Sequence, residues 1–437
     1  MSIEISEEVV KQLCNMLGDD DKGVRDAVST TLIFNGNPVI PKYLVPFVSS
    51  PDISVRNLAG EVLLRIGDPA VDDMTAYIEL GDDDAKKFVI DILGLIGSSK
   101  PLDTIIQVLK TNSNENVILA CLEAIGNIAE PGSLPVLIEF YETNELYKPT
   151  IVEALGKLNS LESLEFMLGK YECEDDLTKF SIIESLGVVG DERTFFFLLA
   201  ELNKIKGPFV GPIIGSLQML KEKHGLDIPF DENIKNAILY TLLESEPKYK
   251  RAAASLVSLF DDKDIMDALL RIYGQDAEID DNIKPSFFRF SDVIYSKLSG
   301  IIRQKPVNLK FLLWLLKDMM EFDNMESINR LSQLEKRNLC DSFSMTLDSP
   351  DEEVRKSSAE LLFYTCPETA LLFADTMIED DNIWNRLKIL ELVENLREPK
   401  AEDVLRKLAS DPEEMIRDRA EWILSQRGLT NFENKPE

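Results

Sequence analysis

Histidine and cysteine supply much of the metal-binding and nucleophilic chemistry of proteins, and this sequence contains few of either. His224 is the single histidine among 437 residues, which excludes a site built on several histidine ligands. The cysteines are scattered and lack the paired spacing of a metal site; they are Cys14, Cys121, Cys173, Cys340 and Cys366. We interpret them as core or near-core thiols in a reducing compartment. No nucleophile stands beside a base and no glycine-rich phosphate loop is present, so we predict no catalytic, cofactor-binding or metal-ligating residue.

Acidic residues dominate the charge of the chain. Its 78 aspartates and glutamates exceed its 47 lysines and arginines, for a formal net charge of -31. Such a charge repels nucleic-acid phosphates and anionic membrane surfaces, and no basic patch offsets it. We therefore expect neither nucleic acid nor membrane as a partner. The start of the chain lacks the pattern of a signal peptide, and no stretch approaches about 18 uninterrupted apolar residues, so we expect a cytoplasmic protein.

The acids gather in short runs. Helix capping and solubility are the simpler interpretation of these runs. The alternative is a rim of carboxylates that attracts a protein partner with a basic surface. None of the runs has the ligand spacing of a calcium loop. The candidate acidic rim consists of Asp19, Asp20, Asp82, Asp83, Asp380 and Asp381.

The runs recur because the whole chain is periodic. Small or polar residues close apolar segments at intervals of 30 to 32 residues; they are Gly36, Gly67, Gly97, Ala129, Asn159, Gly190 and Lys221. Eleven residues before each lies a mostly basic position, such as Arg25 and Arg56, and the same position reappears at Arg355, Arg386 and Arg417. Self-similarity at this period predicts stacked pairs of antiparallel helices.

The local chemistry of each unit fits that prediction. Ser50-Pro51-Asp52 places a capping side chain, a proline and an acid at a helix start, and Gly67 can adopt the left-handed conformation that ends a helix. A second apolar helix follows each stop. We call the recurring basic residues, such as Arg25, Arg56 and Arg355, the basic ladder, and we expect them to form hydrogen bonds between adjacent repeats. We expect the second helices to line the concave face.

One unit carries a family resemblance. Asp52 to Ala59, followed by Leu63 to Ala70, resembles the HEAT repeat, particularly the bacterial type similar to phycobilisome lyase subunits. Asp351 to Leu362 and Glu413 to Gly428 resemble it nearly as well. The resemblance agrees with an all-α fold, an α-solenoid or superhelix. It implies almost nothing about function.

The count of units is about 13 antiparallel helix pairs of about 31 residues, with an irregular middle. The units centred near Arg289 and Asn324 break the period. We divide the chain into an N-terminal capping helix (1–18), regular repeats (19–221), irregular repeats with insertions (222–324), regular repeats (325–428) and a flexible tail (429–437).

An aromatic cluster lies in the irregular middle. Burial in the core is the simpler interpretation, but exposed aromatics beside arginine are also typical of interface hot spots. The candidate partner-binding residues are therefore Phe287, Phe288, Arg289 and Phe290. We expect a non-enzymatic scaffold or adaptor that binds proteins along the solenoid. The alternative, implied by the resemblance alone, is an accessory subunit of a lyase-like or cofactor-attachment enzyme.

Overall fold

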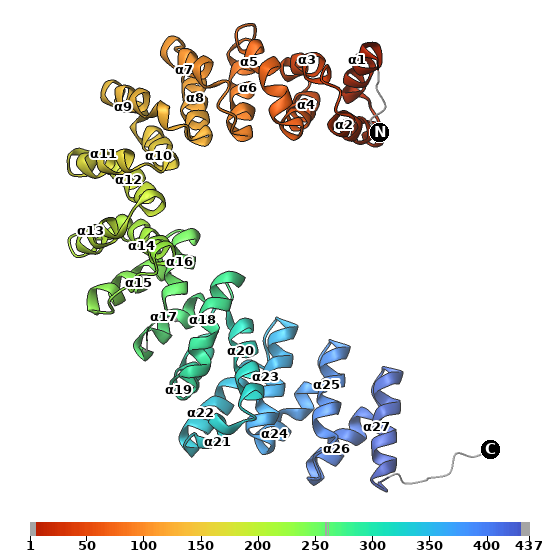
Figure 1. Ribbon diagram of the computed structural model, residues 1–437. Helices are drawn as coiled ribbons and strands as arrows, with labels where there is room; N and C mark the ends of the chain where they lie inside the picture. Colours follow the sequence, from red (N-terminus) through yellow and green to blue (C-terminus); the bar gives the residue numbers. More distant parts are fainter. Residues whose placement is uncertain (1–5, 258–259, 261, 430–437) are drawn as a thin grey trace. The chain divides into compact units, whose positions relative to one another are not determined.

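The computed structural model describes residues 6–257, 260 and 262–429, and over these ranges all regular structure is helical. The predicted all-α solenoid is thereby confirmed (Figure 1). Residues 430–437 of the predicted tail lie outside the described residues. The chain divides into two compact units, unit 1 up to Pro229 and unit 2 from Phe230. Each unit is described by itself.

Unit 1 is a double layer of helices. They are α1 (Glu7–Asn15), α2 (Lys22–Asn35), α3 (Ile40–Leu44), α4 (Ile53–Ile66), α5 (Val71–Ile78), α6 (Asp83–Ile96), α7 (Leu102–Thr111), α8 (Glu115–Ile128), α9 (Leu134–Thr143), α10 (Lys148–Leu158), α11 (Leu161–Lys170), α12 (Asp176–Val189), α13 (Glu192–Leu202) and α14 (Val210–His224). The even-numbered helices, α2 to α14, open the repeats, and we call them the first helices. The helices that follow them are the second helices.

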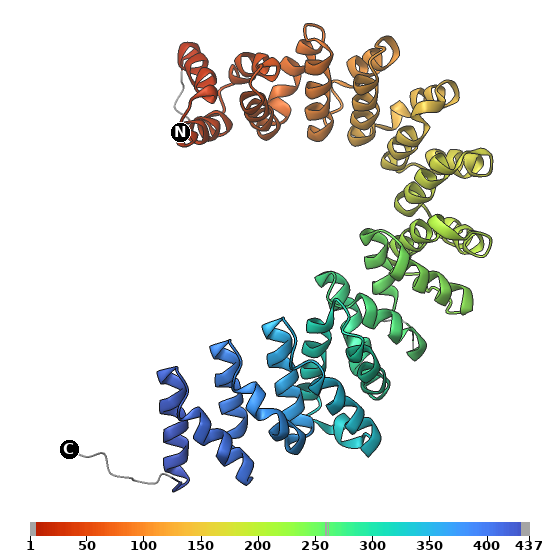
Figure 2. The same cartoon turned by 180° about the vertical axis from the view of Figure 1, so that it is seen from behind.

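The first helices lie on the inside of the curve of unit 1, and the second helices lie on the outside (Figures 1 and 2). The prediction that second helices line the concave face is therefore wrong for this unit. Small residues supply the physical reason. A Cβ atom added to Gly94 would lie 2.8 Å from Ala124 Cα, and one added to Gly126 would lie 2.8 Å from Ala154 Cα. Contacts this close let successive first helices approach one another, so this layer becomes the shorter, inner one.

Unit 2 has the same two layers. Its helices are α15 (Glu232–Glu244), α16 (Pro247–Val257), α17 (Met266–Ile272), α18 (Ala277–Arg289), α19 (Ser291–Arg303), α20 (Leu309–Phe322), α21 (Glu326–Arg330), α22 (Gln333–Ser344), α23 (Glu352–Thr365), α24 (Pro367–Met377), α25 (Ile383–Val393), α26 (Pro399–Leu408) and α27 (Glu414–Gln426). The first helices are α16, α18, α20, α23, α25 and α27. Together with the seven of unit 1 they make thirteen in the described ranges, in agreement with the predicted count. In the part of the chain described, no second helix follows α27.

The middle of the chain keeps the repeat but shifts its register. Asp276 caps α18, and α20 begins after Asn308, so the units expected near Arg289 and Asn324 start earlier than predicted. The additional residues after α20 form the short helix α21, which lies outside the predicted irregular segment. A fixed period extrapolated backwards from Arg355 does not locate this insertion, because α21 lengthens only one repeat.

Two of the cysteines are bonded to each other. Cys340 in α22 and Cys366 at the start of α24 form a disulfide, with their Cα atoms 6.3 Å apart. The interpretation of all five cysteines as thiols is therefore wrong for this pair. Cys14 and Cys121 are buried thiols, as expected, whereas Cys173 is an exposed thiol and does not belong to the core. Burial raises the pKa of Cys14 to about 11 and, with a smaller contribution from the charge of Asp91, that of Cys121 to about 12.

Candidate protein-binding surface

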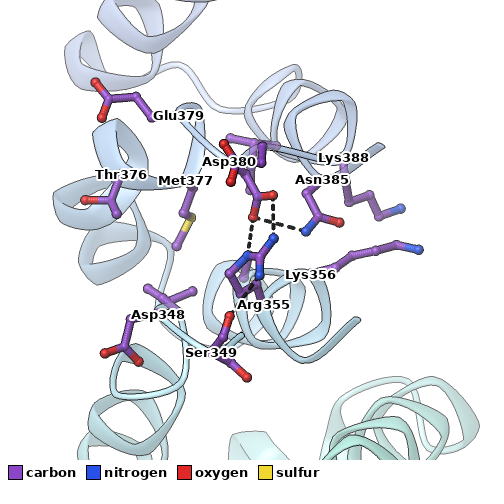
Figure 3. A pocket seen from close by; sticks show the side chains of 14 residues that line it. Asp348, Ser349, Arg355, Lys356, Thr376, Met377, Glu379, Asp380, Asn385 and Lys388 are labelled. Carbon is purple, nitrogen blue, oxygen red and sulfur yellow. Dashed lines mark hydrogen bonds and ion pairs between the residues drawn. The ribbon is translucent and has the colours of Figure 1, made fainter. Parts of the chain in front are cut away.

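The basic ladder joins neighbouring repeats. In unit 2, Arg355 donates from Nε and Nη2 to the Asp380 carboxylate at 2.7 and 2.9 Å, and from Nη1 to the Ser349 carbonyl at 2.8 Å (Figure 3). Burial acts to raise the pKa of Asp380, but hydrogen bonds from Arg355, the Asn382 amide and Asn385 hold it below its usual range. The predicted hydrogen bonds between adjacent repeats are thus confirmed at this position. The charges of Arg355 and Asp380 therefore stabilise the fold.

A cavity of about 260 Å³ lies beside this ion pair (Figure 3). Its wall includes Asp348, Thr376 and Glu379 as well as Arg355 and Asp380. Two of the charged groups that line it, the Arg355 guanidinium and the Asp380 carboxylate, are bonded to each other. No group of three or more potential metal ligands occurs in the described ranges.

The candidate acidic rim proves to be largely structural. Asp82 caps α6 by accepting from the Ala85 amide at 2.9 Å, and the neighbouring Asp83 accepts from Asn112 at 3.1 Å. Asp19 accepts from the Asp21 amide at 2.9 Å. The backbone carbonyls of Asp19 and Asp20 accept from Arg25, at 2.6 and 3.1 Å. Asp380 belongs to the ion pair described above, and Asp381 beside it is exposed. The rim is not a continuous row of free carboxylates.

The aromatic cluster also serves the core for the most part. Phe287 is fully buried and packs edge-on against Tyr273, with ring centres 5.4 Å apart. It is therefore not a contact residue, which corrects the prediction at this position. Phe288 is half-buried against Phe322. Of the four candidates, Arg289 alone is exposed, and it lies over the half-buried ring of Phe290. The cluster offers no broad aromatic surface.

The first helices of unit 1 share an exposed stripe on the inside of the curve. Helix α8 shows the pattern well: its other sides are buried against neighbours, and after its first turn the exposed residues are Glu123 and Asn127. These two positions lie one helical turn apart, so they face the same way. Each first helix thus contributes a narrow row of side chains to a surface that runs across the unit.

Carboxylates repeat along this stripe, one on each of five consecutive first helices from α4 to α12. We call this set the carboxylate ladder. It consists of Glu61, Asp91, Glu123, Glu153 and Glu184, which are 30 to 32 residues apart and exposed or half-buried. Lys87 pairs with Asp91 at 2.6 Å. At the same position, α2 has Thr30 and α14 has Gly215, so the ladder ends on both sides.

Sequence reasoning missed the carboxylate ladder, although a signal for it existed. The caps at Asp52, Asp82, Asn114 and Asp175 define a register, and the ninth residue after each cap is acidic. The acid runs at the helix starts are the more conspicuous feature of the sequence. Helix capping explains those runs, whereas a residue in the middle of a helix caps nothing.

The described chain is a helical-repeat protein, and part of it matches a known family. The family model for HEAT repeats matches residues 71–148, from α5 to the start of α10. This match supports the HEAT-repeat resemblance; it does not extend to the phycobilisome-lyase type. No curated protein matches the chain.

Two solved structures illustrate the likeness to other helical proteins. One is a chain from the structure of Kap95p bound to RanGDP, with 11% identity, coverage of 95% of this chain and 62% of that chain, and a TM-score of 0.43. The other comes from work on the interaction between cadherin and beta-catenin, with 12% identity, coverage of 95% and 94%, and a TM-score of 0.26. The chain thus spans less than two thirds of the first structure's chain.

Proposed function

We propose that this protein is a non-enzymatic scaffold or adaptor that binds a protein partner along the inner face of unit 1. The observation that carries the proposal is the exposed stripe of the first helices, which continues from one repeat to the next. A solenoid buries its core between stacked repeats and leaves an extended surface of this kind for binding. The partner has a basic surface, because the stripe bears the carboxylate ladder.

Site-specific photo-crosslinking tests the proposal. A photoreactive amino acid at Asn127, in the stripe of α8, is expected to crosslink a protein partner in cells. The matched control carries the same group at Gln107, an exposed residue of the second helix α7, and is expected to crosslink none. The partner identified from Asn127 must then bind the purified chain. Crosslinking from Gln107 alone, or turnover of a small molecule by the purified chain, would refute the proposal.

The proposed setting is the cytoplasm of a bacterium. No described helix is long and apolar enough to cross a membrane. The disulfide between Cys340 and Cys366 stands against a reducing compartment, since disulfides persist mainly in oxidising ones. Alkylation of free thiols in intact cells before lysis distinguishes a reducing compartment from an oxidising one. Reduced Cys340 and Cys366 would agree with the cytoplasm, and a disulfide between them would not.

The alternative function is an accessory subunit of a lyase-like or cofactor-attachment enzyme. It rests on the resemblance to phycobilisome lyase repeats, and the match to HEAT repeats does not separate it from a scaffold. Incubation with bilin followed by gel filtration tests it directly. Bilin absorbance that co-elutes with the protein would favour the accessory subunit of an enzyme.

A further inference from the structure

All three tryptophans of the chain lie on first helices of unit 2 and remain exposed. Trp314 of α20 is 38% exposed, Trp422 of α27 is 49% exposed and Trp384 of α25 is 63% exposed. Tryptophan is highly buried in most proteins, and an exposed ring is a frequent centre of binding energy at interfaces. Three such rings in one layer of one unit therefore call for a reason other than core packing.

Two of the three rings already carry a cation of the chain itself. Lys310 Nζ lies 4.8 Å from the centre of the Trp314 ring, and the Arg419 guanidinium lies 4.6 Å from the centre of the Trp422 ring. Both distances are in the range of a cation–π interaction. Among the described residues, no lysine or arginine lies over the Trp384 ring. The most exposed tryptophan is thus the one without a cation of its own.

The surroundings of Trp422 show what a completed arrangement contains. Arg419, besides lying over the indole, donates from Nη2 to both carboxylate oxygens of Glu394, at 2.8 and 3.0 Å. One guanidinium therefore contacts a ring with its face and a carboxylate with its N–H groups. Arginine suits this double contact because its charged group is planar and its donors lie in that plane.

The surroundings of Trp384 offer the same two kinds of partner. Trp384 lines an open recess of about 400 Å³ between the starts of α23 and α25, together with Glu352, Asp381 and Ile383. The Glu352 carboxylate accepts one hydrogen bond, from the Asn382 side chain at 2.6 Å. The Asp381 carboxylate has no partner within the described ranges. A ring, two carboxylates and an apolar side chain therefore meet in one recess.

The cations of the neighbouring helices are bound to other acids. Arg355 also lines the recess, but its Nε and Nη2 donate to Asp380. The hydrogen bond to Asp380 is the main cause of the raised pKa of Arg355, ahead of the charges of the two recess carboxylates. The two lysines of α23 and α25, Lys356 and Lys388, are each paired with a glutamate of their own helix. The recess therefore keeps a net negative charge.

We propose that this recess binds an arginine side chain of a protein partner. The guanidinium lies over the Trp384 ring and donates to Asp381 and Glu352, while the methylene stem packs on Ile383. Trp422, Arg419 and Glu394 are the model for this arrangement within the chain itself. The inference goes beyond the proposed function, because it concerns unit 2 and names the side chain that the partner supplies.

Fluorine NMR tests the site on the full-length chain. Protein made with 5-fluorotryptophan should give one signal for each of its three tryptophans, and Trp384→Phe identifies the signal of residue 384. A capped Gly-Arg-Gly peptide is expected to shift the Trp384 signal and to saturate it below about 20 mM. The signals of Trp314 and Trp422 should stay in place, because Lys310 and Arg419 already lie over those rings. No shift, or equal shifts of all three signals, would overturn the proposal.

Two further peptides test the chemistry of the ligand. Citrulline in place of arginine keeps the shape of the side chain but removes its charge, so binding should weaken about tenfold. Lysine keeps the charge but lacks the planar group, and about threefold weaker binding is expected. Equal affinity for the citrulline peptide would show that charge plays no part and would refute the site. Equal or tighter binding of the lysine peptide would refute the assignment to arginine.

Charge-removal variants test the location. Glu352→Gln with Asp381→Asn removes both carboxylate charges of the recess and should weaken binding of the arginine peptide about tenfold. The matched control, Glu368→Gln with Asp403→Asn, removes two exposed acids of the second helices α24 and α26. It should bind within about twofold of the parent chain, because exposed charges far from the ligand are screened. Circular dichroism verifies that both variants fold.

The result for the recess is separate from the result for the inner face of unit 1. Equal losses in the two double variants would indicate attraction by net charge alone and would contradict the recess as the site. Crosslinking from Asn127 concerns unit 1 only, so the scaffold proposal can stand or fall independently of the arginine peptide.

Discussion

Arg386 and Asp411, 25 residues apart in the sequence, form a two-point ion pair inside unit 2. Nε lies 2.9 Å from Oδ2 and Nη2 lies 3.0 Å from Oδ1. The two side chains are only 9% and 3% exposed. Arg386 also donates from Nη1 to the Asp380 carbonyl at 2.8 Å, in the loop before its own helix. One side chain therefore fixes the start of α25 and the loop that precedes α27.

Removal of one partner of this pair should destabilise unit 2 strongly. Asp411→Asn leaves the Arg386 charge buried without its counter-ion, and the expected loss in unfolding free energy is about 3 kcal/mol. Urea denaturation measures it. The control is Asp375→Asn, which breaks the exposed pair with Lys407 and should cost less than about 1 kcal/mol. Similar losses in the two variants would contradict a structural role for the buried pair.

The same carboxylates should make the protein sensitive to acid. Burial acts to raise the pKa of Asp411, but the Arg386 hydrogen bonds outweigh it and hold the pKa below its usual range; Asp380 behaves alike. A lowered folded pKa contributes stability above the unfolded value of about 3.9, and this is lost as pH falls through the folded pKa. Unfolding free energy measured from pH 5 to 2 should therefore fall less steeply in Asp411→Asn than in the parent. Equal slopes would argue against the pKa shift.

Glycines on the first helices of unit 1 should not tolerate a side chain. A Cβ added to Gly187 would lie 2.9 Å from Ser216 Cα, so Gly187→Ala should lower stability by about 1–3 kcal/mol through overpacking. Gly169 in the second helix α11 has open space at its Cβ position. Gly169→Ala should therefore raise stability by about 0.5–1 kcal/mol. Thermal denaturation of the two variants checks the opposite signs.

The disulfide between Cys340 and Cys366 should lower the number of titratable thiols and raise the free energy of unfolding. Denatured, unreduced protein is expected to show three titratable thiols out of five, since Cys340 and Cys366 are bonded. Cys340→Ser should cost about 3 kcal/mol, the usual loss for a bond that closes a loop of this size. Cys173→Ser, at an exposed thiol, should be nearly neutral. Five titratable thiols without reductant would show that the bond does not form.

Local patterns carried most of the fold prediction. The cap at Asp52, the stop at Gly67 and the basic residue four places after each cap act over one or two helical turns, so they can be read from neighbouring letters. Their repetition predicted the solenoid and the number of repeats. The positions of the middle repeats were predicted wrongly because one repeat contains the additional helix α21. An insertion in a single repeat does not recur, so periodicity cannot reveal it.

The sequence by itself determined that the chain is a stack of capped helix pairs, because capping and helical periodicity are short-range. Only the tertiary structure decided which layer is concave, since close contacts such as Gly94 with Ala124 join residues of different repeats. It also decided that Phe287 is buried, that Cys340 bonds Cys366, and that Glu123 is exposed to solvent on the inner layer of unit 1. Each of these depends on the distance between helices that are separate in the sequence, and no local pattern encodes that distance.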